Sequence, residues 1–467
     1  MLFNSLIFLV FLPVVFTAYW LIPAKHRNIF LLIASYYFYF CYNPWFLLLL
    51  IGTSGLDFYL AKAISKTEVQ AKRQTFLVLS IISNIGVLFA FKYFVFFYNS
   101  GLSIFSNNPQ LLSNFIIPAG LSFYTFQSIS YTIDVYRNKY KADDTLKDFL
   151  LYVSFFPHMV AGPIVRHHTL MPQIKTIHFF KDIEWGNASK LIIWGFFKKM
   201  VIADNIAYIV NPAFNDLPNN YNSIEFIIIG ILFLIQLYAD FSGYSDIAIG
   251  VAKLFKINLN INWKRPLLSK SVTEYWQRHH ISLTSWFKEY VYISIGGNRV
   301  SAPKWVFNIL IVFLLSGLWH GANSTFIIWG LLNGLFYLLE HIPIKQKIKI
   351  PTFIKWAYTL FFVSIFFIAF RANTIADLEF IYQQIFIHFN MNNGLHHLLE
   401  LNDRLFFVVL FFLLGILFMK EVQEEYSIFK TSDFKENYLV PTFYITILCL
   451  IFCLGNFNAN SFIYFQF

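Results

Sequence analysis

The residue that points most directly to chemistry is a histidine deep in an apolar run. His320 lies in the segment Gly-Leu-Trp-His-Gly-Ala-Asn (residues 317–323), within the apolar stretch 305–339. A helix that begins at Trp305 would carry His320 roughly 23 Å along its axis, which is within the hydrocarbon depth of a membrane. A titratable side chain is costly there and is a functional-site candidate by default. We expect His320 to act as a general base on a hydroxyl, rather than only to bond a neighbouring carbonyl.

A basic stretch precedes this run and adds a second histidine, His280. Residues 264–299 hold six basic side chains against two acidic ones, a net charge of +4. The preference for Lys and Arg in cytoplasmic loops explains that charge by itself, but not the Trp and His residues among them. We therefore predict a cytoplasmic face that binds a polyphosphate ligand such as coenzyme A. The binding residues predicted in this stretch are Trp276, Arg278, Trp286, Lys288 and Arg299.

Carboxylates and hydroxyls follow directly after another apolar run. Residues 236–246 read Gln-Leu-Tyr-Ala-Asp-Phe-Ser-Gly-Tyr-Ser-Asp. We predict that Asp240 and Ser242 help to bind substrate. A transport site would have a similar composition, so a transporter or flippase that uses Asp240 and Asp246 is the alternative. Such a transporter predicts inverted repeats with paired broken helices, and the sequence has no such symmetry.

The C-terminal residues are unusually aromatic. A polar turn, 455–460, is followed by Ser-Phe-Ile-Tyr-Phe-Gln-Phe, whereas chain ends are normally polar and loose. One interpretation is an aromatic anchor at the lipid surface. The other is a plug that returns into the helices and delivers the Tyr464 hydroxyl. We accordingly predict a transmembrane domain, 1–455, and a tail with an acceptor tyrosine, 456–467.

Composition identifies the elements that must position these residues. The chain is 57% hydrophobic and 13% charged, whereas soluble domains carry roughly 25% charged residues. No soluble basic domain for nucleic acid is visible, and the three cysteines lack metal-ligand spacing. We expect an all-α polytopic membrane protein with about eleven spans, and a re-entrant piece at 155–164 where two prolines break the run. The expected spans are 3–22, 29–51, 75–98, 116–135, 190–210, 224–240, 305–318, 324–339, 354–370, 405–419 and 440–455.

Together these motifs resemble the membrane-bound O-acyltransferase (MBOAT) family, and most closely its bacterial branch that O-acetylates envelope polysaccharides such as alginate and peptidoglycan. The resemblance covers nearly the whole chain. Gln277, His279 and Ser324 depart from the family pattern, which affects the details of substrate binding rather than the class. The matching segments are 156–163, 238–250, 274–286 and 317–323.

The resemblance implies a ring of transmembrane helices with re-entrant segments around a central tunnel, in the inner (cytoplasmic) membrane of a bacterium. It implies acetyl-CoA as the acyl donor and no metal. The deep catalytic histidine of the family falls on His320 and the second histidine on His280. Tyr464 resembles a C-terminal tyrosine that the related D-alanyl teichoic-acid system links to a small partner peptide. The resemblance implies two partners: an extracytoplasmic SGNH-type acetyltransferase and the membrane lipid.

These expectations combine into one mechanism. Acetyl-CoA docks at the basic face, and its thioester reaches His320 while Tyr464 approaches from the opposite side. His320 deprotonates the Tyr464 hydroxyl, and His280 orients the thioester or the base. Asn323 and Trp319 place the carbonyl oxygen. A scaffold that only recruits the extracytoplasmic enzyme is a third possibility, but it leaves an intramembrane histidine unexplained.

Overall fold

Helices make up the regular structure of this chain. The computed structural model describes residues 1–105, 112, 116–218, 221–342, 350–390, 394–401, 404–428, 438–457 and 462–463, and Tyr464 lies outside them. Within these ranges no strand occurs. Among the same residues, six helices are long and apolar enough to cross a membrane, which confirms an all-α polytopic membrane protein. They are Pro44–Lys66, Gln70–Asn99, Ser223–Leu254, Ala302–His320, Thr352–Arg371 and Arg404–Tyr426.

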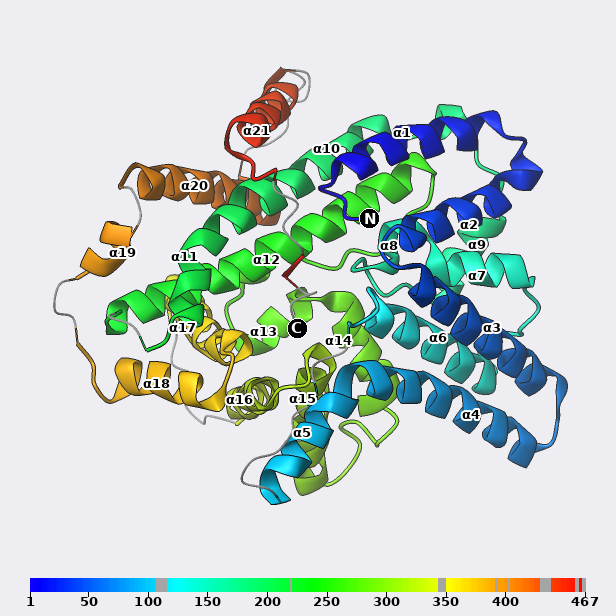
Figure 1. Cartoon of the computed structure of the whole chain (residues 1–467), viewed down its shortest axis with the longest axis horizontal. Coiled ribbons are helices and arrows are strands. Elements are labelled where there is room, and N and C mark those ends of the chain that lie inside the picture. The colour runs from blue at the N-terminus through cyan, green and yellow to red at the C-terminus, as the bar shows by residue number, and fades with distance from the viewer. Residues whose placement is uncertain are drawn as a thin grey trace. The chain divides into compact units, whose positions relative to one another are not determined.

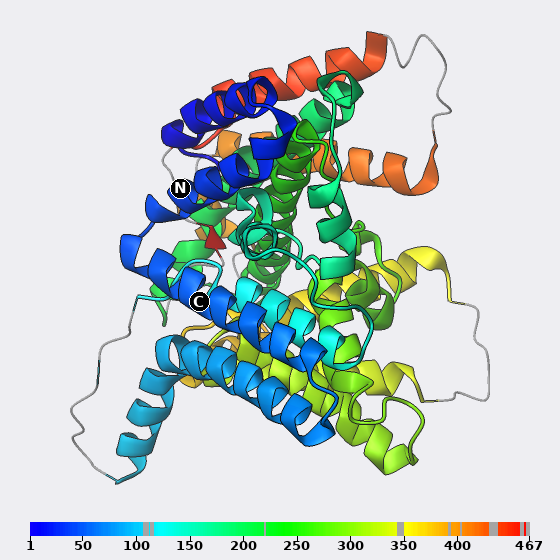
Figure 2. The same ribbon diagram turned by 90° about the vertical axis from the view of Figure 1, so that its right-hand side faces the viewer.

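The chain divides into two units. Unit 1 comprises residues 1–192 and 245–261, and unit 2 comprises 193–244 and 262–467. In unit 1 the helices α3, α4 and α6 pack on one another, as both views show (Figures 1 and 2). The helices that lie in unit 1 are α1 (Leu6–Leu21), α2 (Ala24–Phe40), α3 (Pro44–Lys66), α4 (Gln70–Leu88), α5 (Phe94–Phe105), α6 (Leu121–Tyr136), α7 (Leu146–Ser154), α8 (Phe156–Met159) and α9 (His167–Lys175).

Two predicted segments of unit 1 are buried inside the protein and differ from lipid-facing helices. The span predicted at 116–135 is the helix α6, which is buried along nearly its whole length and carries many Ser and Thr side chains. Its polar side chains suit an interior helix better than a lipid-facing one. The broken segment 155–164 contains only the four-residue helix α8 and is buried throughout. Pro and Gly interrupt the helix in this segment. Irregular backbone of this kind is tolerated inside protein, where its polar groups find partners, rather than against lipid.

Unit 2 holds every predicted catalytic and binding residue that the structure describes. The long helix α12 begins here and ends in unit 1. The helical elements that lie in or enter unit 2 are α10 (Trp185–Phe196), the π-helical stretch η3 (Phe197–Ala203), α11 (Asp204–Asn215), α12 (Ser223–Leu254), the short η4 (Pro266–Leu268), α13 (Val272–Arg278), α14 (Ile281–Phe287), η5 (Lys288–Tyr292), α15 (Ala302–His320), α16 (Ser324–Glu340), α17 (Thr352–Arg371), α18 (Ile375–Phe386), α19 (His396–Leu401), α20 (Arg404–Tyr426) and α21 (Val440–Leu454).

Helices α15 and α16 pack closely against each other, and α15 ends at His320 (Figures 1 and 2). A Cβ atom at Gly317 would lie 2.3 Å from the Phe326 carbonyl oxygen, so only glycine allows the two backbones to come this near. Residues 321–323 link the two helices, and the Asn323 side chain caps α16 by accepting the Thr325 N–H at 3.2 Å. The separation of the spans predicted at 305–318 and 324–339 is therefore confirmed, and His320 lies in the last turn of α15.

Candidate active site

His320 is enclosed by aromatic rings. Its side chain is buried, and its ring lies 5.0 Å from Trp319, 5.1 Å from Trp329 and 5.1 Å from Phe370 between centroids. These rings come from α15, α16 and α17, so three helices build the enclosure. Aromatic walls exclude bulk water, and electrostatic interactions are stronger in such a site than in solvent. The His320 ring is thus shielded from bulk water by these three aromatic rings.

His280 is held in an unusual backbone conformation. It joins α13 to α14 with φ 44° and ψ 54°, the left-handed region that few residues other than glycine adopt. Its carbonyl accepts the N–H groups of Leu283 and Thr284, both at 3.0 Å, and so begins α14. Strained backbone of this kind persists where the surrounding structure enforces it, commonly at functional sites.

Hydrogen bonds fix which nitrogen of His280 carries the proton. The Asn262 side chain accepts the Ser282 N–H at 3.1 Å, so the Asn262 atom that faces this loop is the oxygen. The same oxygen lies 3.2 Å from His280 Nδ1, which must therefore donate. Burial lowers the pKa of His280 to about 3. The imidazole is then neutral at physiological pH, with its lone pair on Nε2, and suits a role in orienting a reactant.

A chain of aromatic contacts joins the two histidines to the C-terminal tail. His280 lies 5.9 Å from Trp319, the residue whose ring also contacts His320. On its other side His280 lies 4.6 Å from Phe241, and Phe241 lies 5.2 Å from Phe462. All of these residues belong to unit 2. The structure thus brings His280 and His320 to one ring, Trp319, and brings the described end of the tail to the same group.

Asp240 takes part in a buried ionic cluster that the sequence did not reveal. Lys199 Nζ lies 2.6 Å from Asp240 Oδ1 and 2.9 Å from Asp204 Oδ1. We call Lys199, Asp204 and Asp240 the Asp240 cluster. Together with Tyr208 and Ile463 it lines a cavity of about 310 Å³. A signal for Lys199 was present, since it lies in the middle of the span predicted at 190–210, where a charge is expensive unless used.

The other predicted binding residues fall into different surroundings. Trp276 is buried, and its ring lies 5.6 Å from Trp329, so it backs the enclosure of His320. Trp286 is buried against Tyr290 at 5.2 Å. Ser242 is fully buried, and its hydroxyl has no hydrogen-bond partner among the described residues.

Asn323 and the three basic residues also differ from one another. The Asn323 amide caps α16 and donates to the Asn373 carbonyl at 2.7 Å, so both of its polar atoms have structural partners. Lys288 and Arg299 are exposed. Arg278 instead forms ion pairs with Glu274 at 2.6 Å and Glu425 at 2.8 Å.

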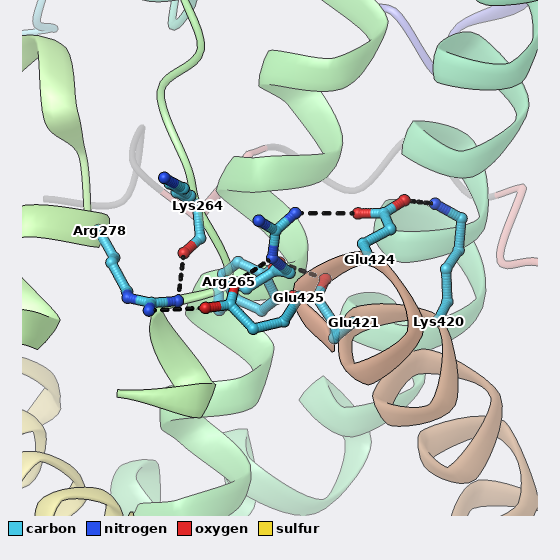
Figure 3. Close-up of polar contacts among 8 residues, drawn as sticks. Lys264, Arg265, Arg278, Lys420, Glu421, Glu424 and Glu425 are labelled. Carbon is cyan, nitrogen blue, oxygen red and sulfur yellow. Dashed lines mark hydrogen bonds and ion pairs between the residues drawn. The ribbon is translucent and has the colours of Figure 1, made fainter. Parts of the chain in front are cut away.

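Glu425 is the centre of a second ionic cluster, shown in Figure 3. Its two oxygens lie 2.8 Å from Arg278 Nη2 and 2.8 Å from Arg265 Nε. Arg265 also reaches Glu424 at 3.5 Å, and Lys420 pairs with Glu424. We call Arg265, Arg278, Glu424 and Glu425 the Glu425 cluster. The two arginines and the two glutamates of this cluster balance each other in charge. Arg278 could therefore bind a polyphosphate only if the polyphosphate replaced one of the carboxylates that now pair with it. In the part of the chain that the structure describes, no group of three His, Cys, Asp or Glu side chains could hold a metal ion.

Comparison with known proteins gives consistent matches. Residues 143–374 match the model of MBOAT, the membrane-bound O-acyltransferase family. A Pseudomonas aeruginosa protein named probable alginate O-acetylase AlgI is 37% identical over 392 residues, which cover 83% of this chain and 75% of the relative. A Helicobacter pylori peptidoglycan O-acetyltransferase is 34% identical, with 80% and 78% covered. A Bacillus subtilis teichoic acid D-alanyltransferase is 29% identical, with 49% and 59% covered.

Proposed function

Since this chain belongs to the membrane-bound O-acyltransferase family and is an acyltransferase, we propose that it takes acetyl from cytoplasmic acetyl-CoA and passes it across the bacterial inner membrane. The final acceptor is a hydroxyl of a cell-envelope polysaccharide, either an alginate-like exopolysaccharide or peptidoglycan. The names of the similar proteins favour acetyl as the group and these two polymers as acceptors. The observation that carries the proposal is that His280 and His320 share one ring, Trp319, inside an aromatic enclosure.

The first step transfers acetyl to Tyr464. The phenol oxygen attacks the thioester carbonyl, a C–O bond forms, and the C–S bond to coenzyme A breaks. His320 takes the phenol proton and returns it to the departing thiolate. His280, neutral and with its lone pair on Nε2, orients the reacting groups. This assignment is supported by Phe462 and Ile463, which directly precede Tyr464, are buried, and contact Phe241 and Asp240.

The second step frees the tyrosine. The acetyl ester of Tyr464 passes to an extracytoplasmic partner of the SGNH acetyltransferase type, whose nucleophile attacks the ester carbonyl. The phenol of Tyr464 is regenerated, and the partner then acetylates a sugar hydroxyl. Two transfers of one acyl group avoid moving coenzyme A itself across the membrane.

The test is the mass of the purified protein and its peptides after incubation with acetyl-CoA. We expect a gain of about 42 Da on the C-terminal peptide, as for a covalent acyl intermediate. The gain should be absent in Tyr464→Phe, and in His320→Ala it should form about 10²–10⁴-fold more slowly. His341→Ala is the matched control, since His341 is exposed beyond α16 and takes no part in the mechanism.

Three outcomes would contradict parts of this scheme. A wild-type rate in His320→Ala removes the general base. Release of coenzyme A in the presence of the partner, without any label on the tail, makes Tyr464 an anchor and the transfer direct. If neither coenzyme A release nor labelling occurs with the partner present, a transporter becomes the better explanation.

A further inference from the structure

The part of the tail next to Tyr464 is bound to a carboxylate. The Ile463 N–H donates to Asp240 Oδ2 at 2.8 Å. The Phe462 ring lies 5.2 Å from Phe241 and 5.3 Å from Tyr244, so it packs on the same face of α12. Phe462 and Ile463 are only 2% and 5% exposed. We propose that Asp240 is a positioning residue, which docks Phe462 and Ile463 of the C-terminal tail on α12 and so positions the acceptor tyrosine that follows them in the sequence.

Asp240 is itself held in place. One of its oxygens, Oδ2, accepts the Ile463 N–H, while the other, Oδ1, pairs with Lys199 at 2.6 Å. Lys199 is fixed in turn by Asp204 at 2.9 Å. Hydrogen bonds to ionised groups are short and strong, and more so in a low-dielectric interior. The carboxylate therefore presents a rigid acceptor to the tail rather than a mobile one.

The backbone around Lys199 is shaped for this contact. Lys199 lies in η3, a π-helical stretch between α10 and α11, and π-helical turns are frequent at functional sites. A Cβ atom at Gly243 would lie 2.7 Å from the Gly195 carbonyl oxygen and 3.1 Å from Lys199 N. Only glycine at this position of α12 allows the two backbones to approach so closely. That approach lets the Lys199 side chain meet Asp240.

The beginning of the tail is bound to the same helical stretch. The Asn456 N–H donates to the Met200 carbonyl at 3.0 Å, and its side-chain amide donates to the Tyr208 hydroxyl at 3.0 Å. The Asn205 side chain donates to the Leu454 carbonyl at 3.1 Å. Met200 lies in η3, and Asn205 and Tyr208 lie in α11. Both described parts of the tail are thus tied to elements that also carry the Asp240 cluster.

A purely structural role for this cluster would be costly. Two buried carboxylates around one lysine stabilise a fold no better than apolar residues of similar volume would. The tail supplies the reason for a carboxylate, because a buried main-chain N–H needs an acceptor. Asp240 satisfies that N–H at the residue before Tyr464. The catalytic consequence rests on the proposed function, whereas the docking of the tail does not.

Hydrogen–deuterium exchange of the full-length protein in detergent tests the docking. Asp240→Ala should raise exchange in the peptide that contains Ile463, while peptides of α15 and α16 stay unchanged and report intact folding. Asp240→Asn keeps an acceptor oxygen and should give a smaller rise. Asp246→Asn alters a carboxylate on the same helix and should leave the tail peptide unchanged. Unchanged exchange at the tail in Asp240→Ala overturns the inference.

A second measurement uses the unmodified protein, in case Asp240→Ala does not fold. Digestion with a carboxypeptidase should stop at the docked segment, leaving Phe462 and Ile463 in place. Trimming beyond Phe462 at the same rate as in unfolded protein overturns the inference.

Acetyl labelling separates this inference from the proposed function. If both hold, Asp240→Ala labels Tyr464 about 10–100-fold more slowly, as expected for a misplaced reactant, with an unchanged KM for acetyl-CoA. If the wild-type tail is never labelled although its exchange still depends on Asp240, the docking stands and the relay fails. If labelling of Asp240→Ala equals that of the wild type, Asp240 does not position the acceptor.

Discussion

The two ionic clusters of unit 2 use similar side chains in opposite surroundings. In the Asp240 cluster the side chains of Lys199, Asp204 and Asp240 are 9%, 6% and 2% exposed. In the Glu425 cluster the exposed fractions are higher, from 15% for Arg278 to 43% for Glu424. One lysine serves two carboxylates in the first cluster, whereas one carboxylate serves two arginines in the second. The side chains of the second cluster are therefore the more accessible to bulk water.

That difference decides what each cluster can do. A buried ion that loses its partner remains uncompensated, which costs about 3–5 kcal/mol, so the Asp240 cluster has one stable arrangement and can fix the position of a bound segment. An exposed ion pair contributes about 0–1 kcal/mol, so the Glu425 cluster can exchange a carboxylate for a phosphate at little cost. The rigid Asp240 cluster is therefore suited to holding the tail, and the Glu425 cluster, whose carboxylates can be exchanged, is suited to binding a soluble donor.

The largest effect is expected from removing the shared lysine of the buried cluster. Lys199→Met leaves Asp204 and Asp240 facing each other without a cation, and we expect the free energy of unfolding to fall by about 3–5 kcal/mol. Thermal unfolding in detergent measures this. The double variant Lys199→Met/Asp240→Asn should recover part of the loss, since it removes one uncompensated charge. A melting temperature equal to that of the wild type would mean that this cluster is not the rigid one.

Local sequence patterns predicted part of this site. The spans predicted at 305–318 and 324–339 already separated two helices beside His320, because helix length and period depend on nearby residues. The ionic partners could not be predicted in this way. Arg278 and Glu425 lie on different elements far apart in the chain, and so do Lys199 and Asp240. Periodicity carries no information about which distant side chains meet.

Backbone strain and helix exposure were equally hidden. His280 was predicted as a functional histidine from its basic surroundings, but neither its left-handed conformation nor its hydrogen bond to the Asn262 side chain, which lies outside the motif, was predicted. The span predicted at 116–135 is the helix α6, which is buried among other helices of unit 1 and is not one of the described helices long and apolar enough to cross a membrane. Composition identifies membrane helices but does not tell which of them face lipid.

A smaller effect is expected where the buried cluster depends on close backbone packing. Gly243→Ala places a methyl group 2.7 Å from the Gly195 carbonyl oxygen at the end of α10 and 3.1 Å from Lys199 N in η3, so α12 must move away from both. Overpacking of this kind costs about 1–3 kcal/mol, and the separation of Lys199 from Asp240 should also raise hydrogen exchange at the tail. Gly415→Ala is the control, because a Cβ atom there meets nothing within 4 Å. Equal stability of the two variants would show that the backbone of α10 and η3 adjusts freely.

The smallest effect on stability, and the one most informative about the donor, is expected at the exposed cluster. Glu425→Gln removes the carboxylate that Arg265 and Arg278 share, at a cost of about 1 kcal/mol or less in stability. Both arginines then lose a competing partner, so KM for acetyl-CoA should fall by up to about fivefold. Arg278→Ala should raise KM instead, and added salt should shrink both changes. If both variants keep the wild-type KM for acetyl-CoA, Arg278 serves only to hold α13 to α20, and the donor docks on exposed basic residues such as Lys288 and Arg299.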